Sequence, residues 1–319
     1  MSNKFVVLSG SAHPEFAQLI ARYLNTELGD CSCGKFSNSE TSVIINESIR
    51  SKDVYIVQPT CYPANDNIME LLVLVDAVRR ASSLHITVVI PFFGYSRRNK
   101  KEKSREPITA KLIANMIETS GVNRVISMDL EASQIQGFFN IPVDNLYAEP
   151  LIVKYIEKNI PATEKRVIVS PAVDGVKRAK LVSDKLNCDL AILDRQTKDD
   201  ETDDMILVGD VKGCVAIIIG SIADTCLTLK IATQILKANG ATKVYALCSH
   251  GELSGNAIET INSSDLEELV ITNSIPQSDK VKACPKIKII NVAPMFGEAL
   301  RRIIHSESIT SQSSKFTIL

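Results

Sequence analysis

Short apolar runs alternate with amphipathic helical patterns along almost the whole chain. The first half begins with FVVLSG, PEFAQLIARYLNTEL, DVYIVQP and NIMELLVLVDAVRRAS, in which runs of strand length precede runs with helical spacing. The rhythm begins again after Tyr147 with PLIVKYIEKNI, RVIVSP, KRAKLVSDKL and DLAILD. Because strands that alternate with helices form parallel sheets with helices packed on them, we predict an α/β fold of mainly parallel sheets with helices on both faces.

The length of the chain favours two domains. A chain of 319 residues is longer than a single hydrophobic core usually organises. The point where the rhythm begins again places the boundary after Tyr147. We therefore predict one domain over residues 1–147 and a second over residues 148–319.

The overall charge and hydrophobicity exclude several classes of protein. A net charge of -1 gives no general attraction to nucleic acid or to acidic membranes. No run approaches the ~18 apolar residues that span a bilayer, and the N-terminal sequence lacks the pattern of a secretion signal. We expect a cytoplasmic protein with no nucleic-acid or membrane partner.

The eight cysteines are scattered, which suits free thiols in a reducing compartment. Cys31 and Cys33 form the only close pair. Because no second pair and no histidine cluster accompany them, we expect no zinc site.

The segment CVAIIIGSIADTCLTLKIATQIL has the frame of a phosphate-binding site. It predicts a buried strand (residues 215–219), a turn (residues 220–227) and a helix from Thr228. A strand that leads into a helix N-terminus is where sheet proteins bind phosphates. Such loops usually need glycine for close approach and carboxylates for hydroxyls or metal, yet Asp224 is the only acid and Leu227 stands where a small residue is expected.

Three other segments contain groups suited to nucleotides or metals, and a fourth is a run of charged residues. RRNKKEKSR (97–105) could bind a polyphosphate, although a solvated charge run has the same composition. FSNSETSV (36–43) combines an aromatic ring, an amide and a carboxylate that could contact a nucleobase, although turn geometry also explains these residues. MDLEAS places carboxylates suited to Mg²⁺ at a strand end. DRQTKDDETDD (194–204) predicts a mobile, solvated loop.

Taken together, FSNSE, SREPITAKL, MDLEASQIQGFFNIPVDNLYAEP and SHGELSG resemble the ribose-phosphate pyrophosphokinase family, also called phosphoribosyl pyrophosphate synthetases. The resemblance covers nearly the whole chain. It implies two phosphoribosyltransferase-type domains and assembly into a hexamer or a higher form. It also implies transfer of the β,γ-pyrophosphate of Mg-ATP to the C1 hydroxyl of ribose 5-phosphate, with Mg²⁺ as the cofactor of the assembly.

Two sets of family residues are retained. The residues that match the adenine-contacting turn and the loop over ATP are Phe36, Asn38, Glu40 and Arg97. The residues that match a regulatory phosphate site and subunit contacts, which loop and interface packing would explain equally well, are Ser133, Gln136, Asn145 and Tyr147. After Arg97 the family usually has Gln and Asp, where this chain has Arg98 and Asn99.

The metal and pyrophosphate positions are altered. Glu131 replaces the family's metal-binding histidine and can still bind Mg²⁺, whereas Ala172 replaces a metal-binding aspartate. Asp174 lies two positions farther along and would point elsewhere. A lysine and an arginine of the family's mobile loop correspond to Arg195 and Thr197, so Arg195 is the single weak catalytic candidate.

The ribose 5-phosphate loop is altered most. The family's two ribose-binding acids correspond to Gly220 and Ser221, and a phosphate-loop glycine corresponds to Leu227. The retained loop residues are Asp224, Thr225 and Thr228. We expect the Leu227 side chain to block the 5-phosphate, and the lone chain to be nearly inactive, because phosphoryl-type transfer depends on positioning and charge neutralisation.

The resemblance favours a non-catalytic subunit, structural or regulatory, that forms a hetero-oligomer with an active ribose-phosphate pyrophosphokinase. In the family a neighbouring subunit donates the adenine turn, so this chain could complete its partner's ATP site. Two alternatives stay open: an active pyrophosphokinase with substituted residues, and a stand-alone sensor of nucleotides or phosphate. The sequence leaves the partner's identity and the binding of ATP, ADP or phosphate open.

Overall fold

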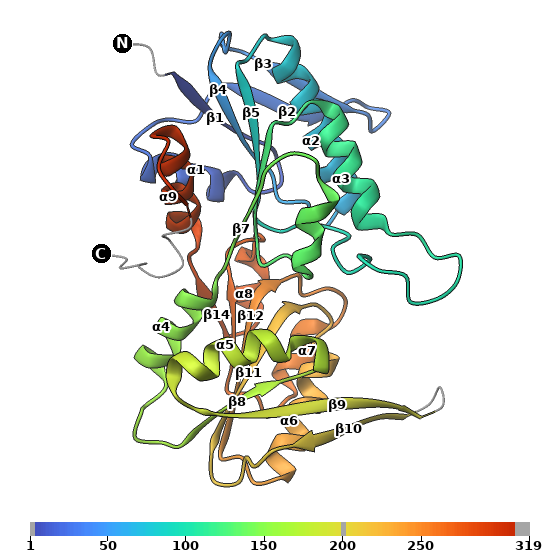
Figure 1. The fold of residues 1–319 in the computed structure, drawn as a ribbon, viewed down its shortest axis with the longest axis vertical. Coiled ribbons are helices and arrows are strands. Elements are labelled where there is room, and N and C mark those ends of the chain that lie inside the picture. Colours follow the sequence, from blue (N-terminus) through green and yellow to red (C-terminus); the bar gives the residue numbers. More distant parts are fainter. Residues whose placement is uncertain (1–3, 199–201, 310–319) are drawn as a thin grey trace. The chain divides into compact units, whose positions relative to one another are not determined.

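A computed structural model describes residues 4–198 and 202–309. The described chain forms two compact units, and each is an α/β structure (Figure 1). The first unit contains residues 4–147, 274–276 and 292–309, and the second contains residues 148–273 and 277–291. Within the described residues, no helix has the length and apolar content needed to cross a membrane.

The first unit is built on a five-stranded parallel sheet. Its strands, in spatial order, are β1 (Phe5–Ser9), β4 (Asp53–Val57), β5 (His85–Ile90), β6 (Arg124–Met128) and β7 (Val143–Leu146). Its helices are α1 (Pro14–Tyr23), α2 (Ala64–Arg80), α3 (Thr109–Ser120), the 3-10 helix η1 (Ser133–Phe138) and α9 (Ala293–Ile304). A separate antiparallel hairpin joins β2 (Cys31–Lys35) to β3 (Thr41–Ile45).

Alternation along β1 explains why both faces of this sheet are covered. Val6 and Leu8 belong to the apolar cluster that also contains Leu71 of α2 and Ile113 of α3. Val7 is fully buried and points to the opposite face, because successive strand residues alternate.

The second unit is built on a seven-stranded sheet. Its strands, in spatial order, are β10 (Thr202–Val208), β9 (Asp189–Lys198), β8 (Arg166–Ser170), β11 (Val215–Ala223), β12 (Lys243–Gly251), β13 (Glu268–Thr272) and β14 (Ile287–Ile290). Among the described strands of this sheet, only β9 and β10 pair antiparallel. Its helices are α4 (Glu149–Asn159), the 3-10 helix η2 (Val173–Gly175), α5 (Val176–Leu186), α6 (Leu227–Ala238), α7 (Ala257–Asn262) and α8 (Ser278–Ala283).

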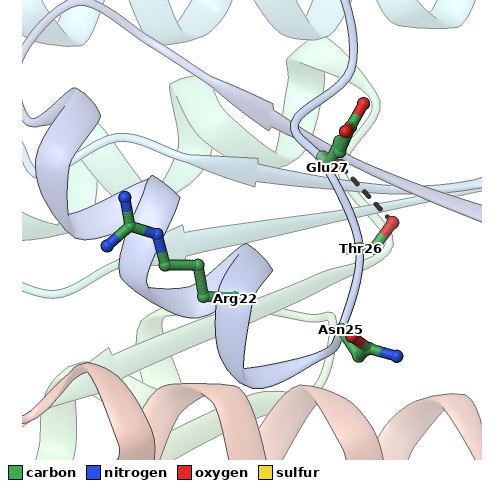
Figure 2. Close-up of a pocket in the computed structure, with 4 residues that line it drawn as sticks. All are labelled: Arg22, Asn25, Thr26 and Glu27. Atoms are coloured by element: carbon green, nitrogen blue, oxygen red, sulfur yellow. Dashed lines mark hydrogen bonds between the residues drawn. The ribbon is translucent and has the colours of Figure 1, made fainter.

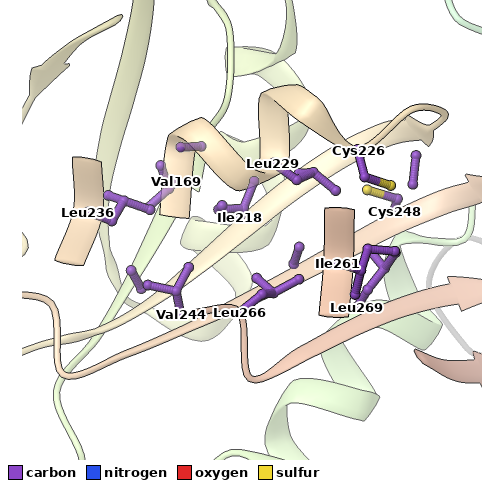
Figure 3. Packing of buried hydrophobic residues seen from close by; sticks show 14 of the residues in the cluster. Val169, Ile218, Cys226, Leu229, Leu236, Val244, Cys248, Ile261, Leu266 and Leu269 are labelled. Carbon is purple, nitrogen blue, oxygen red and sulfur yellow. The ribbon is translucent and has the colours of Figure 1, made fainter. Parts of the chain in front are cut away.

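The core of the second unit supports the strand that leads to the candidate phosphate loop. Ile218 of β11 packs in one cluster with Leu229 and Leu236 of α6 and Ile261 of α7 (Figure 3). Burial of such side chains contributes about 1.5–3 kcal/mol each. The predicted α/β class, with mainly parallel sheets, is confirmed.

The last helix departs from the predicted domain division. The first segment of the first unit runs to Tyr147, but residues 274–276 and the segment that contains α9 also belong to this unit and not to the second. Phe296 of α9 is fully buried and meets Phe16 of α1 edge-on, with 5.4 Å between ring centroids. Gly297 lets α9 approach Tyr23, whose Cδ1 would lie 2.6 Å from a Cβ at this position.

Two local predictions were wrong. The expected charged loop at residues 194–204 forms the outer ends of β9 and β10, where backbone pairing joins Lys198 to Thr202. Residues 199–201 lie outside the described part. The expected turn at residues 220–227 begins later, because pairing with β12 extends β11 to Ala223.

Candidate nucleotide and phosphate sites

The turn between β2 and β3 presents an aromatic ring to solvent. The Phe36 N–H donates to the Glu40 carbonyl at 2.8 Å, and the Asn38 side-chain oxygen accepts from the Glu40 N–H at 3.1 Å. Ser39 takes a left-handed conformation with φ of 69°, which closes the turn. Phe36 is 58% exposed, so one face of its ring can stack on a planar ligand.

The first turn of α2 holds both this hairpin and the loop that follows β5. The Lys35 ammonium lies 2.6 Å from the Asp66 carboxylate. The Tyr95 hydroxyl donates to the Asn65 side-chain oxygen. Since Arg97 is exposed two residues after Tyr95, adjacent residues of α2 anchor both predicted nucleotide segments.

The loop after β5 begins in close contact with the end of β4. A Cβ at Gly94 would lie 2.4 Å from the Thr60 carbonyl oxygen, so only glycine fits there. The Gly94 N–H donates to the Thr60 hydroxyl at 2.7 Å. Farther along, the Asn99 amide donates to the Ser96 carbonyl at 2.7 Å, which stabilises the loop around Arg97.

A carboxylate organises the basic part of the same loop. Glu106 accepts hydrogen bonds from the N–H groups of Lys103 and Glu102, each at 3.1 Å. These bonds hold the pKa of Glu106 below its ordinary value. The loop therefore contains internal structure and is more than a solvated run of cations.

The candidate phosphate loop ends at the N-terminus of α6. Cys226 precedes the helix with a φ of 61°, and among the described side chains none caps the helix. The first-turn N–H groups of α6 thus keep the direction that suits an anion. Leu227 is the first helical residue and is 56% exposed, so its apolar side chain stands in solvent at this end.

The remaining loop residues offer little negative charge for ribose hydroxyls. Gly220 lies on β11 opposite Cys248, and a Cβ at Gly220 would lie 2.7 Å from the Cys248 sulfur. The Ser221 hydroxyl is buried without a partner among the described residues. The Asp224 carboxylate accepts a hydrogen bond from the Ser254 hydroxyl, and the residues Thr225 and Thr228 are exposed.

The predicted metal positions do not form a three-ligand cluster. Asp129 is buried and Glu131 is exposed just after β6. In residues 4–198 and 202–309, no group of three His, Cys, Asp or Glu side chains is arranged to hold a metal ion. Two carboxylates fit the oxygen chemistry of Mg²⁺, which usually binds through one or two protein carboxylates together with substrate phosphates.

The predicted metal and pyrophosphate positions of the second unit are distributed over two elements. The Ala172 carbonyl accepts from the Ser170 hydroxyl at 2.7 Å, next to η2, while Asp174 is exposed. Arg195 and Thr197 lie on β9, and their side chains are outside the described part.

The predicted regulatory residues lie at the carboxyl ends of β6 and β7. The Gln136 amide donates to the Ser133 carbonyl at 3.2 Å within η1. The Asn145 side-chain oxygen accepts from the Leu130 N–H at 3.2 Å, which joins β7 to the loop after β6. Tyr147 is exposed, and a phosphate-binding role for this set stays a prediction.

A surface pocket also lies beside the C-terminus of α1 (Figure 2). Its lining residues are Arg22, Asn25, Thr26 and Glu27. The Thr26 hydroxyl donates to the Glu27 carbonyl at 3.4 Å. None of the predicted site residues lines this pocket.

Two family profiles match the chain. The N-terminal domain of ribose phosphate pyrophosphokinase matches residues 5–121, and a phosphoribosyl synthetase-associated domain matches residues 203–312. The chain belongs to the ribose-phosphate pyrophosphokinase family. The resemblance noted in the sequence is therefore confirmed.

Several relatives of this family match over almost their full length. Ribose-phosphate pyrophosphokinase C of Dictyostelium discoideum is 76% identical over 98% of both chains, and ribose-phosphate pyrophosphokinase A of the same organism is 60% identical over 98% of both. The crystal structure of phosphoribosylpyrophosphate synthetase from Mycobacterium smegmatis is 34% identical. It superposes with a TM-score of 0.90, covering 96% of this chain and 100% of that one. This similarity confirms the predicted fold with two phosphoribosyltransferase-type domains.

Sequence reasoning did not identify the residues that anchor the nucleotide segments. Asn65, Asp66 and Tyr95 lie in strings that resemble the family, QPTCYPANDNIMELL and FFGYSRRNKKEKSREPITAKL, but none has an obvious chemical role by itself. Their anchoring role becomes visible only in the structure, where Asp66 pairs with Lys35 and Tyr95 pairs with Asn65.

Proposed function

We propose that this chain is a non-catalytic subunit of a ribose-phosphate pyrophosphokinase assembly. In that assembly it supports the formation of 5-phosphoribosyl 1-pyrophosphate from ATP and ribose 5-phosphate for nucleotide biosynthesis. The observation that carries the proposal is the altered loop between β11 and α6, where Leu227 is exposed at the helix N-terminus and residues 220 and 221 have no carboxylate.

The altered loop argues against turnover by the lone chain. Ribose hydroxyls are usually held by carboxylates that accept their hydrogen bonds, and Asp224 is the one acid in residues 220–228. Loss of a single positioning or charge-stabilising group typically lowers kcat by about 10²–10³. Several such groups are replaced here. Because they act as a unit, their effects on kcat do not simply multiply, but the site as a whole should lose its activity.

The nucleotide side supports a role toward a partner. The Phe36 ring is exposed in a turn that internal hydrogen bonds and the Lys35–Asp66 pair hold in place. A rigid, exposed aromatic ring can contact the base of a nucleotide bound by another subunit. This chain would then contribute Phe36, Asn38 and Glu40 to a site whose ribose 5-phosphate loop belongs to the partner.

The partner we propose is an active ribose-phosphate pyrophosphokinase subunit, in a hexamer or a higher assembly that uses Mg²⁺. Three proteins of Dictyostelium discoideum with the names ribose-phosphate pyrophosphokinase A, B and C match this chain at 60%, 55% and 76% identity. The existence of several such proteins in one organism supports assembly from non-identical subunits.

The first experiment measures AMP release by the purified chain with ATP, ribose 5-phosphate and Mg²⁺. We expect no turnover above background. A kcat of about 1 per second, which is within the ordinary range of enzymes, would contradict the proposal. It would support an active pyrophosphokinase with substituted residues, which the 76% identity to a relative with that name favours as the second candidate.

The second experiment tests the donated turn in a co-expressed complex with an active relative. Phe36→Ala in this chain should lower the complex's activity by about tenfold, the loss expected for about 1.4 kcal/mol of base stacking. Leu84→Ala, which truncates another exposed apolar side chain of the first unit, serves as the matched control. Failure to co-purify, with unaltered activity of the relative, would instead favour a free-standing nucleotide or phosphate sensor.

A further inference from the structure

Two thiols point to one face of strand β2. Cys31 and Cys33 are two positions apart, and side chains with this spacing share a face of a strand. Their sulfurs lie 3.4 Å and 3.9 Å from the same atom, the Ser9 carbonyl oxygen. The two sulfurs therefore converge on one point at the end of β1.

The pair is partly closed to water, and the carboxylates of Asp30 and Glu70 lie close enough to act on it. Both cysteines are half-buried and pack against the hydrophobic cluster of the first unit. The two thiols also form a hydrogen bond with each other. Within the described chain, no third His, Cys, Asp or Glu completes a larger ligand cluster around them.

We propose that Cys31 and Cys33 form a two-sulfur site for a soft monovalent metal ion of the Cu(I) class. Soft thiolates select such ions over Mg²⁺ or Ca²⁺, which prefer oxygen. Structural zinc sites almost always have four ligands, whereas a d¹⁰ monovalent ion is stable between two thiolates. The ion enters as Cu(I) without a change of oxidation state, two S–Cu bonds form, and the two thiol protons pass to solvent.

The site is independent of the proposed function. It lies on β2, the strand that leads into the Phe36 turn, and a bound ion would bridge two positions of this one strand. The proposal concerns binding of the ion only. It can succeed or fail whatever the activity of the assembly.

The test is an anaerobic titration of the full-length chain against a chromogenic Cu(I) chelator. We expect the chain to withdraw one Cu(I) from the chelator. Cys31→Ser and Cys33→Ser should each weaken binding by more than about 100-fold, beyond the effect of losing a supporting contact. Failure of the unmodified chain to compete, or wild-type affinity in both variants, would overturn the proposal.

A second thiol pair provides the matched control. Cys226 and Cys248 lie close together in the core of the second unit (Figure 3), and burial raises the pKa of each to about 12. Because such thiols are inert, Cys226→Ser should bind Cu(I) like the unmodified chain. X-ray absorption on the copper-loaded chain should show two sulfur ligands. A cluster with more sulfurs, or nitrogen and oxygen ligands, would refute the assigned site.

Discussion

The ammonium group of Lys35 lies 2.6 Å from the carboxylate of Asp66, and this pair joins the β2–β3 hairpin to the first turn of α2. Both side chains are about half exposed, so their attraction is screened by water. The Lys35–Asp66 pair therefore matters for the position of the hairpin more than for the free energy of unfolding. The pair fixes the strand end next to Phe36, while the neighbouring Asn65 fixes the loop that contains Arg97.

Asp66→Asn should therefore affect nucleotide binding more than folding. We expect adenine-nucleotide affinity of the co-expressed complex to fall severalfold, and the free energy of unfolding to change by less than about 1 kcal/mol, since exposed ion pairs contribute little. Calorimetry and urea unfolding measure the two effects. The control is Asp76→Asn, which breaks an equally short pair with Arg80 at the other end of α2. Equal loss of affinity in both variants would contradict a positional role for Asp66.

The strands and helices were predictable because their signals are local. The apolar runs at β1, β4, β5 and β6 are bounded by turn residues, and the helices between them have clear helical spacing. The return of α9 to the first unit was not predictable, since it depends on the fit of Phe296 against Phe16, residues far apart in the sequence. The extension of β9 and β10 through an acidic segment depends on backbone pairing, which composition does not reveal.

The candidate sites were predictable in part for the same reason. Phe36 and Arg97 belong to strings typical of the family, and the structure shows both segments anchored on α2. The anchoring residues were missed because their roles exist only as pairs. At the other site, the sequence identified the altered residues Gly220 and Leu227, whereas the close approach of the Cys248 sulfur to Gly220 required the register of β11 and β12.

Leu227→Gly should raise affinity for ribose 5-phosphate without producing turnover. Leu227 begins α6 without a positive φ, so glycine relieves no backbone strain and any gain comes from removing the side chain. We expect about tenfold tighter binding, the equivalent of about one charge-assisted hydrogen bond. Calorimetry of the lone chain with ribose 5-phosphate measures this affinity.

The control is Leu227→Ala, which keeps the restricted backbone and should produce most of the same gain in affinity. Tight binding by the unmodified chain, or no gain in either variant, would contradict the steric role of Leu227.

Phe296→Ala should loosen α9 and α1 together. Removing a fully buried aromatic ring typically costs about 3–5 kcal/mol, and here the cavity would open between these two helices. Hydrogen exchange followed by mass spectrometry should show faster exchange in peptides from both helices and unchanged exchange in β11 and β12 of the second unit. The control is Leu84→Ala at an exposed position of the first unit. Faster exchange in the second unit instead would mean that α9 stabilises that unit.

Glu298 should make the stability of the first unit depend on acid. Hydrogen bonds from Arg301 and Arg302 lower the pKa of Glu298 from 4.5 to about 2, against the opposing effect of partial burial. Since the folded state has the lower pKa, its stabilisation is complete above pH 4.5 and is lost as the pH falls toward 2. Glu298→Gln should therefore lower the urea midpoint at pH 6 more than at pH 3, where the unmodified chain has already lost part of this contribution.

Glu157→Gln, at an exposed position of α4, is the control and should shift the midpoint little at either pH. An equal shift at pH 6 and pH 3 for Glu298→Gln would show that the hydrogen bond from the Tyr23 hydroxyl, and not the charge of Glu298, stabilises the contact between α1 and α9.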